Sequence, residues 1–264
     1  MIMKKGISLQ GYVPMRDQPS NTSEMVSQVL FGEEFTILET RDQWHLISLD
    51  FDSYVGWVGV SRVQTIEAGN EIGNGSGIPY RMVSQPAVTV WDVKLDRQMI
   101  LPAGSILPGT SGNTVTISGR KYELSSGEGI LVPGPEADPE QTGNKIISIP
   151  YLWGGRCGFG FDCSGLTQTL CRMLGISLPR DAVQQAALGE TVNLIHEARK
   201  GDLAFFENRC GEIAHTGMML GGGKILHAYT DVRIDWIDQH GIYDTEKRTY
   251  THKLRVIKRI LRQK

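Results

Sequence analysis

The sequence has no long apolar run and no strong excess of charge of one sign. Of its 264 residues, 40% are hydrophobic and 21% are charged, and the formal net charge is −2. A membrane span needs about 18 apolar residues in succession and a signal peptide about 7–15, yet residues 1–6 lead directly into polar positions. We therefore expect no membrane insertion and a cytoplasmic protein as the sequence stands, or a periplasmic or secreted one if a signal peptide was removed.

Basic patches are equally scarce. Positive charge gathers only at the C-terminus, in Lys-Arg-Ile-Leu-Arg-Gln-Lys at 258–264. A nucleic-acid partner generally requires a basic face, so we predict none, and we interpret this tail as a solvated segment after the last strand. We expect a monomer.

Cysteines are few and lack the spacing of a metal site. The four lie at positions 157, 163, 171 and 210, with no C-x-x-C pair of the kind typical of zinc ligands. We therefore predict no disulfide and no metal. Cys171 follows Cys163 by eight residues in one predicted helix and is interpreted as a small buried apolar group, whereas Cys157 and Cys210 are expected in loops without a functional role.

Aromatic residues make up only 8% of the chain, whereas glycine is plentiful, with 31 residues. That balance suits a β-rich chain with many turns. Short apolar runs separated by turn residues occur at 35–38, 44–49 and 56–60, a pattern typical of a small antiparallel barrel. Residues 67–77 are poor in apolar groups and are interpreted as a linker. Further runs at 87–91, 114–117 and 129–132 predict a second barrel.

The pattern changes after a proline-rich joint at residues 133–139. Helices are predicted over 141–149, 163–174 and 181–188, and strands over 202–206, 213–220, 224–229 and 256–260. This order indicates an α+β unit in which helices pack against an antiparallel sheet. We predict three domains: a barrel at 1–66, a second barrel at 67–135 and the α+β unit at 136–264.

One cysteine stands where a loop gives way to a helix. The segment Phe161-Asp162-Cys163-Ser164-Gly165 follows an aromatic and glycine-rich stretch at 150–155, and leucines recur behind it at positions 166, 170 and 174, which is helical spacing. Asp162 can cap this helix, and the unpaired N–H groups of the first turn favour a thiolate. Such a position can lower a cysteine pKa from about 8.5 towards about 4–7. Cys163 is therefore predicted to be a nucleophile.

A thiol nucleophile needs a base, and histidine titrates near neutrality. His215 and His227 flank three glycines at 221–223, a predicted hairpin turn. With an even register the two histidines share one sheet face, opposite or diagonal to each other, whereas a slip of one residue separates them. Because the base imidazole needs a partner that orients it, we predict this role for His227. The other histidines, at 45, 196, 240 and 252, are interpreted as structural or solvated.

These segments together resemble the NlpC-type cysteine peptidases of bacterial cell-wall metabolism, which have a papain-like core. The resemblance rests on residues 150–165, Leu178-Pro179-Arg180-Asp181, the turn at 200–203 and the histidine hairpin, and it covers most of 140–264. It implies that Cys163 is the nucleophile, that His215 is the general base and acid, and that His227 orients His215. It also implies that no metal or organic cofactor is required.

The two preceding barrels are similar to the bacterial SH3-like domains of family members that cleave free murein peptides, the γ-D-glutamyl-L-diamino-acid endopeptidases or dipeptidyl-peptidases VI. In those enzymes the first barrel recognises the free amine of L-Ala. Residues 23–28 and 54–58 look like that pattern, which implies that Glu24 pairs with the ammonium group and Tyr54 positions it. The further substrate-binding residues that the resemblance implies are Tyr151, Trp153, Asp162, Ser164, Arg180 and Asp181.

One position departs from that subgroup. Its members often carry a small hydroxyl residue after the Arg-Asp pair, where this chain has Ala182. One hydrogen bond to the D-Glu carboxylate is therefore missing or is supplied by Arg180 or water.

The expected reaction is hydrolysis of the γ-D-glutamyl-L-diamino acid bond of murein peptides with a free L-Ala, which releases L-Ala-γ-D-Glu. Two alternatives remain open. One is an N-acetylmuramoyl-L-alanine amidase on the same core, and the other is a non-catalytic cell-wall binding module. Retention of Cys163, His215 and His227 together argues against the binding module.

Overall fold

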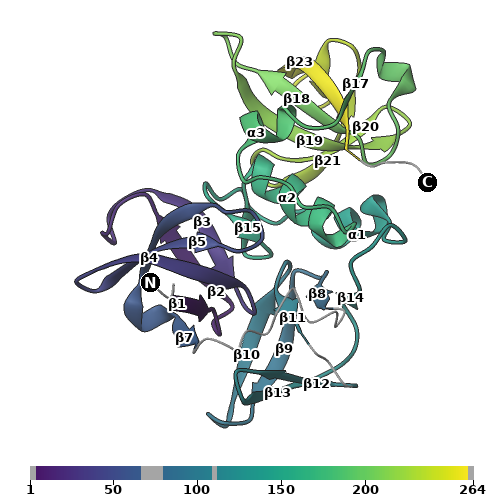
Figure 1. Ribbon diagram of the computed structural model, residues 1–264. Coiled ribbons are helices and arrows are strands. Elements are labelled where there is room, and N and C mark those ends of the chain that lie inside the picture. The colour runs from purple at the N-terminus through teal and green to yellow at the C-terminus, as the bar shows by residue number, and fades with distance from the viewer. Residues whose placement is uncertain (1–3, 67–79, 109–111, 261–264) are drawn as a thin grey trace.

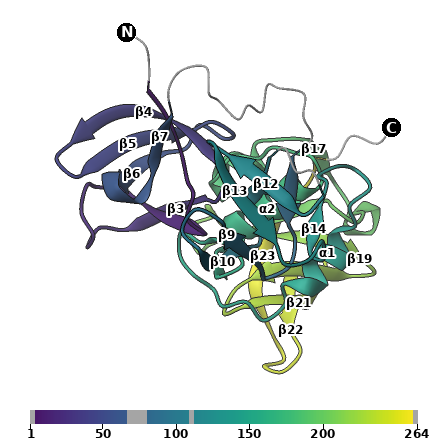
Figure 2. The same cartoon turned by 90° about the horizontal axis from the view of Figure 1, so that it is seen from below.

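The computed structural model describes residues 4–66, 80–108 and 112–260. The whole of the predicted linker, at 67–77, and the end of the basic tail, at 261–264, lie outside the described residues. Three units surround helix α2 (Cys163–Met173): a purple and blue barrel, a second blue-green β unit, and a green to yellow unit that holds the C-terminus (Figure 1). Figure 2 shows the same arrangement from below. Within the described residues, no helix is both long enough and apolar enough to cross a membrane.

The first unit is a seven-stranded antiparallel sheet in the order β3-β2-β6-β5-β4-β1-β7. Its strands are β1 (Lys4–Ile7), β2 (Tyr12–Arg16), β3 (Met25–Leu30), β4 (Glu34–Arg41), β5 (Trp44–Leu49), β6 (Val55–Gly59) and β7 (Gln64–Ile66). Alternate residues of β5 are buried, which is the period expected of a strand with one face on a core. That core contains Val13, Phe35, Ile47 and Val58.

The second unit consists of two small antiparallel sheets, β10-β9-β13-β12 and β11-β8-β14. Its strands are β8 (Arg81–Val83), β9 (Ala87–Asp92), β10 (Arg97–Pro102), β11 (Ile106–Leu107), β12 (Thr114–Ile117), β13 (Arg120–Leu124) and β14 (Ile130–Leu131). Its core is continuous with the first unit, because Ile7 and Phe31 belong to the same buried cluster as Val83 and Leu107.

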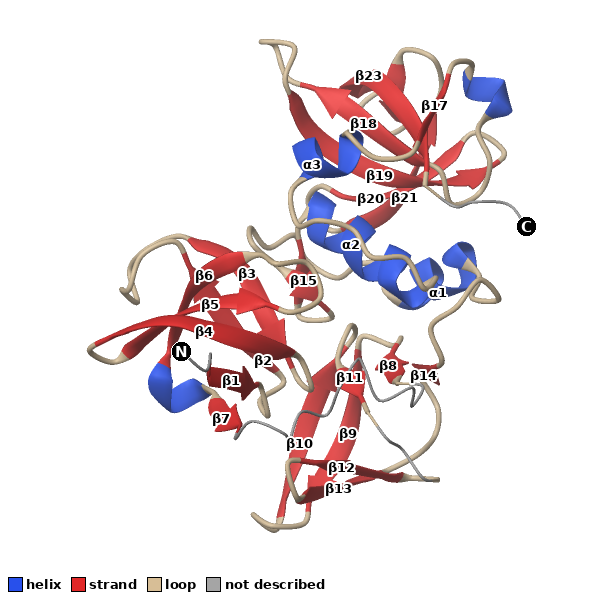
Figure 3. Ribbon diagram, viewed as in Figure 1, coloured by secondary structure: helices blue, strands red, loops and turns tan. Residues whose placement is uncertain are grey.

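The third unit is mostly sheet (Figure 3). Its seven strands run in the order β17-β23-β18-β19-β20-β21-β22, and an additional pairing between β22 and β23 closes the sheet on itself. The strands are β17 (Glu190–Val192), β18 (Leu203–Glu207), β19 (Ile213–Gly221), β20 (Lys224–Ala228), β21 (Val232–Ile237), β22 (Gly241–Asp244) and β23 (Thr249–Arg259). A two-stranded ribbon of β15 (Arg156–Cys157) and β16 (Gly160–Phe161) precedes α2.

The predicted α+β packing is only partly confirmed, because helices are few and short. α2 does pack on β19 and β20, but α1 (Pro139–Lys145) and α3 (Ala182–Ala186) have only seven and five residues. α1 begins earlier than predicted because Pro139 occupies its first turn and Asp138 caps it through the N–H of Glu140. The strand predicted over 256–260 is the end of the eleven-residue β23, whose first half is polar. Cys157 lies buried in β15 rather than in a loop.

Buried charges join the first barrel to the third unit. The Glu33 carboxylate is paired with both Arg156, in β15, and Arg172, in α2. The Phe51 ring lies against both guanidinium groups, at 4.7 Å from Arg156 and 4.1 Å from Arg172, a geometry that favours cation–π attraction. Gln168 of α2 also donates to Asp52, at 2.8 Å. These contacts fix the barrel against β15 and the second half of α2.

Candidate active site

Cys163 is the first residue of α2, as predicted from the sequence. Asp162 precedes it in an extended conformation and caps the helix by accepting the N–H of Gly165 at 2.7 Å. The other carboxylate oxygen accepts the N–H of Gly154 at 2.9 Å. One side chain therefore joins the glycine-rich loop to the helix that carries the thiol.

The position of Cys163 at a helix start predicted a thiolate, but in the free protein this residue is protonated. Burial raises the pKa of Cys163 to about 11, and the negative charge of Asp162 adds to this rise. The N–H groups of Thr216 and Ser164 and the charge of Arg180 act in the opposite direction without overcoming it. The sequence-based expectation was wrong because it counted the helix terminus but not burial, which disfavours a charged sulfur. In this state Cys163 is a thiol.

His215 and His227 share one face of the sheet, in the diagonal arrangement. Gly217 of β19 pairs with His227 of β20, which leaves His215 two residues along β19. The two rings meet with His215 Nε2 at 2.9 Å from His227 Nδ1. The turn between the strands uses positive φ angles at three glycines, 221, 222 and 223, which suit glycine best.

Asp235 of β21 forms a hydrogen bond with His227 and thereby determines which ring nitrogens of His227 and His215 carry a proton. Its Oδ2 lies 3.0 Å from His227 Nε2. Burial raises the pKa of Asp235, but hydrogen bonds from His227 and Arg233 outweigh this and lower the pKa overall. A carboxylate only accepts, so His227 Nε2 carries the proton and its Nδ1 accepts from His215 Nε2. The Nδ1 atom of His215 is then left with a free lone pair.

His215 is neutral and lies on a strand that contacts Cys163. Burial is the main cause that holds the pKa of His215 well below 6.5, and protonation of His252 or His227 would lower that pKa further, so the His215 ring is neutral at pH 7. The backbone N–H of Thr216, the next residue along β19, contacts the Cys163 sulfur. This places the strand that carries His215 beside the thiol. The resting pair is therefore a thiol and a neutral imidazole.

Sequence reasoning missed two members of this cluster. Asp235 lies in β21, which was not predicted, although Val232-Arg233-Ile234-Asp235-Trp236-Ile237 alternates in a way typical of a strand. His252 was interpreted as structural or solvated, but it lies within β23 and its ring stacks on that of His215 with centroids 4.1 Å apart.

A cleft of about 390 Å³ lies between the first barrel and the third unit. Its lining includes Cys163 and all eight residues that the family resemblance implied for substrate binding: Glu24, Tyr54, Tyr151, Trp153, Asp162, Ser164, Arg180 and Asp181. Ala182 and the largely exposed Val183 also line it. Residues more than 150 positions apart in sequence therefore surround one thiol.

The barrel side of the cleft has its own contacts in the free protein. Trp153 Nε1 donates to Glu24 Oε1 at 2.5 Å. Tyr54 directs its hydroxyl to Asp181, at 3.5 Å, rather than to Glu24. Burial, reinforced by the charge of Asp181, raises the pKa of Tyr54 to about 12, so its phenol stays protonated and can donate.

Arg180 is buried and largely occupied. Its guanidinium donates to both oxygens of Asp162, at 3.0 and 2.5 Å, to Ser164 Oγ at 2.9 Å and to Ser27 Oγ at 3.2 Å. Four of its five N–H donors are thus used within the protein. Arg180 holds Asp162 and Ser164 in place, and has little capacity to replace the hydroxyl absent at Ala182. In the part of the chain that the structure describes, no group of three or more His, Cys, Asp or Glu is arranged to hold a metal ion.

Comparison with known proteins gives consistent matches. Residues 148–255 match the NlpC/P60 family and residues 15–63 match the bacterial dipeptidyl-peptidase Sh3 domain. A gamma-D-glutamyl-L-lysine dipeptidyl-peptidase of Bacillus subtilis is 31% identical over 222 residues, which cover 76% of this chain and 71% of that protein. A protein of the same name from Bacillus cereus is 28% identical over 232 residues, or 79% of this chain and 68% of the relative.

Solved structures show the same fold. An NlpC/P60 family protein from Bacillus cereus superimposes with a TM-score of 0.82 at 22% identity, covering 98% of this chain and all of that one (100%). An NlpC/P60 endopeptidase from Photobacterium damselae gives a TM-score of 0.67 at 18% identity, over 96% of this chain and 70% of that one. With a helix-start cysteine, a histidine pair and an SH3-like first domain in place, the chain belongs to the NlpC/P60 family of peptidoglycan peptidases.

Proposed function

We propose that the protein is a cysteine peptidase that hydrolyses the γ-D-glutamyl-L-diamino acid bond of murein peptides with a free N-terminal L-Ala, and releases L-Ala-γ-D-Glu. The observation that carries this proposal is the hydrogen-bonded series Asp235, His227 and His215, together with the contact between the N–H of Thr216, the residue after His215, and the sulfur of Cys163 at a helix start. The dipeptidyl-peptidase Sh3 match and the names of the two Bacillus relatives support the choice of bond.

Acylation begins from the neutral pair. His215 Nδ1 takes the thiol proton as the Cys163 sulfur attacks the γ-carbonyl carbon of D-Glu. The oxyanion accepts hydrogen bonds from backbone N–H groups at the start of α2, including that of Cys163. The new imidazolium keeps its Nε2–H bond to His227, whose other nitrogen donates to Asp235. The Asp235 carboxylate, two hydrogen bonds away, thereby stabilises the positive charge on His215.

The same imidazole completes acylation and then serves deacylation. Protonated His215 gives its proton to the departing amine of the diamino acid, which completes acylation and leaves a thioester on Cys163. In deacylation, His215, neutral again, takes a proton from water as the water oxygen attacks the thioester carbonyl. His215 then returns this proton to the departing Cys163 sulfur, which restores the thiol and releases the dipeptide.

The first barrel selects the free amine through Glu24. In the free protein the Glu24 carboxylate already accepts the Trp153 indole N–H, so a blocked peptide does not leave that carboxylate without a partner. An L-Ala ammonium adds a hydrogen bond between charged groups, worth about 1.5–3 kcal/mol. We therefore expect about a ten- to hundredfold preference for free over N-acetylated peptide. Free peptides released into the cytoplasm would be the substrates that such a preference selects. A single chain lines the whole cleft, which is consistent with a monomer.

The test is mass spectrometry of L-Ala-γ-D-Glu-meso-diaminopimelate and its N-acetyl derivative after incubation with enzyme. The wild type should release L-Ala-γ-D-Glu mainly from the free peptide, Cys163→Ala should release none, and Glu24→Gln should lose most of the discrimination. Equal cleavage of both peptides by the wild type would remove the role of Glu24. Cleavage of neither would favour the binding module, and release of the intact L-Ala-γ-D-Glu-meso-diaminopimelate peptide from its N-acetylmuramoyl conjugate would favour the amidase.

A further inference from the structure

Three imidazole rings form one cluster on the inner face of the closed sheet. The ring of His252 stacks on that of His215, with centroids 4.1 Å apart and planes inclined by 25°. His227 meets both rings edge-on, at 5.1 Å from His215 and 5.7 Å from His252. Phe206 stands 5.7 Å from His215. The proposed base is thus in contact with rings from β18, β20 and β23.

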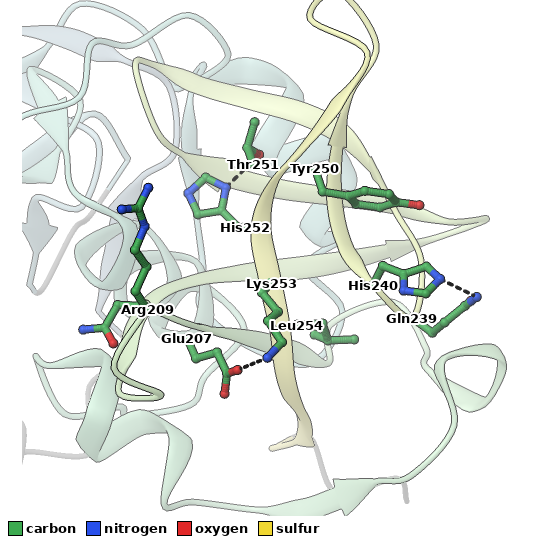
Figure 4. Close-up of a pocket in the computed structure, with 10 residues that line it drawn as sticks. Glu207, Arg209, Gln239, His240, Tyr250, Thr251, His252, Lys253 and Leu254 are labelled. Carbon is green, nitrogen blue, oxygen red and sulfur yellow. Dashed lines mark hydrogen bonds and ion pairs between the residues drawn. The ribbon is translucent and has the colours of Figure 1, made fainter.

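His252 is the member of this cluster that also lines a separate cavity. The cavity, of about 920 Å³, is lined by the loop after β18, the turn before β22 and residues 250–254 of β23 (Figure 4). His252 Nδ1 lies 2.9 Å from Thr251 Oγ1, and Tyr229 contacts the ring edge-on at 4.8 Å. Burial, followed by the charge of His227, lowers the pKa of His252 to about 4, against the opposing charge of Asp235. The His252 ring is therefore neutral near pH 7.

We propose that His252 is a positioning residue for the general base: its ring, stacked on His215, holds that imidazole with Nε2 toward His227 and Nδ1 toward Cys163. This inference rests on the catalytic roles proposed above. No role was expected for His252 from the sequence, and its ring lines the other cavity rather than the substrate cleft.

The physical reason is rotation about the Cβ–Cγ bond of His215. That torsion is broad in histidine, with two alternatives related by a half turn, and the half turn replaces each ring nitrogen by a carbon. To pass between them the ring must turn its edge toward His252, across a centroid separation of only 4.1 Å. An aromatic ring at position 252 closes that path, whereas a flexible aliphatic side chain opens it. A neutral ring also adds no charge beside a base that must become cationic.

The experiment compares His252→Leu, which removes the stacked ring, with His252→Phe, which keeps it. His252→Leu should lower kcat for the murein tripeptide about tenfold or more, because misplaced catalytic groups cost rate rather than binding, and should leave KM within about twofold. His252→Phe should stay within about threefold of the wild type. His240→Ala, which alters the same cavity without contact to His215, is the matched control and should change neither constant.

A second measurement needs no substrate. The rate at which iodoacetamide alkylates Cys163, followed by peptide mass spectrometry, depends on the thiol and imidazole pair. It should fall in His252→Leu and recover in His252→Phe. If His252→Leu destabilises the fold, His252→Gln provides a second non-aromatic variant, and thermal unfolding of each protein is compared.

The outcomes separate the two proposals. Equal slowing by Leu and Phe, or no slowing by Leu and Gln, would overturn the positioning role. A wild type that does not cleave the peptide, but whose Cys163 alkylation follows the predicted Leu and Phe pattern, would support the positioning role and overturn the substrate. A wild type that does not cleave the peptide, and whose Cys163 is alkylated at the same rate as in His252→Leu, would overturn both.

Discussion

The two N-terminal β units contact the rest of the molecule in different ways. The first is joined to β15 and α2 by buried charges and hydrogen bonds, with Glu33 between two arginines. The second is joined to the first by apolar side chains, among them Leu107 and Phe31. The lining of the cleft comes from the first unit and the third unit.

The difference matches what each interface must achieve. Hydrogen bonds and ion pairs are directional, so a barrel held by them has one position relative to Cys163, and Glu24 reaches the cleft at a fixed distance from the thiol. Apolar contacts are non-directional and tolerate repacking at little cost. The unit that supplies cleft residues is therefore fixed by buried ion pairs and side-chain hydrogen bonds, whereas the other is fixed mainly by apolar burial, with a backbone hydrogen bond from Ile106 to Phe31 at 2.8 Å.

The largest predicted effect comes from breaking the charged interface. Glu33→Gln leaves Arg156 and Arg172 buried without their carboxylate, which we expect to cost about 3–5 kcal/mol of unfolding free energy. Peptidase activity should fall with it, because the barrel loses its position over the cleft. Urea unfolding followed by circular dichroism measures the loss. Glu123→Gln, in the exposed pair with Lys121, is the control and should cost less than about 1 kcal/mol. Equal losses in the two variants would contradict the comparison.

The next effect tests the apolar interface. Leu107→Ala removes a fully buried side chain from the core that both N-terminal units share and should cost about 2–4 kcal/mol. Because no cleft contact changes, kcat/KM at 25 °C should stay within about twofold of the wild type. A large loss of kcat/KM in folded Leu107→Ala protein would show that the second unit also positions the cleft.

The smallest predicted effect concerns the stability of the second and third units at acidic pH. Residues 67–135 contain no histidine, whereas the third unit buries His252 with its pKa lowered from 6.5 to about 4. Because the unfolded chain takes up this proton first, the stability that the neutral ring provides is complete above pH 6.5 and is lost as the pH falls towards 4. After discounting for solvent screening, we expect a loss of about 2 kcal/mol.

His252→Phe isolates that contribution. Urea unfolding at pH 7.0 and 4.5 should show a smaller decrease for the variant than for the wild type. The same decrease in both proteins would mean that His252 does not retain its neutral form in the fold.

The sequence predicted those parts of the site that depend on local patterns. The cap at Asp162, the helix behind Cys163 and the glycine turn after His215 each arise from neighbouring residues. The diagonal pairing of His215 with His227 remained one of two alternatives, because register depends on strand pairing that residues 213–228 alone do not specify.

Contacts between distant segments left no local signal. Glu33 follows a glycine in what looks like a surface turn, and its partners lie 123 and 139 residues away. The raised pKa of Cys163 has the same origin, since burial depends on the whole fold while the helix terminus is visible in five residues. His252 escaped notice because the predicted strand began only at residue 256, although Tyr250, Leu254 and Val256 alternate with polar residues through the first half of β23.

The closure of the catalytic sheet has a consequence for how peptides meet this protein. An open sheet exposes backbone N–H and C=O groups along its edge, and an extended peptide can add to them as a further strand. Here β23 pairs with β18 on one side and with β22 and β17 on the other, so among the described strands of this sheet the three-residue β17 is the end strand that pairs with a single neighbouring strand. Peptide backbone has few unproductive places to dock on the catalytic unit, and an extended substrate is left with the cleft.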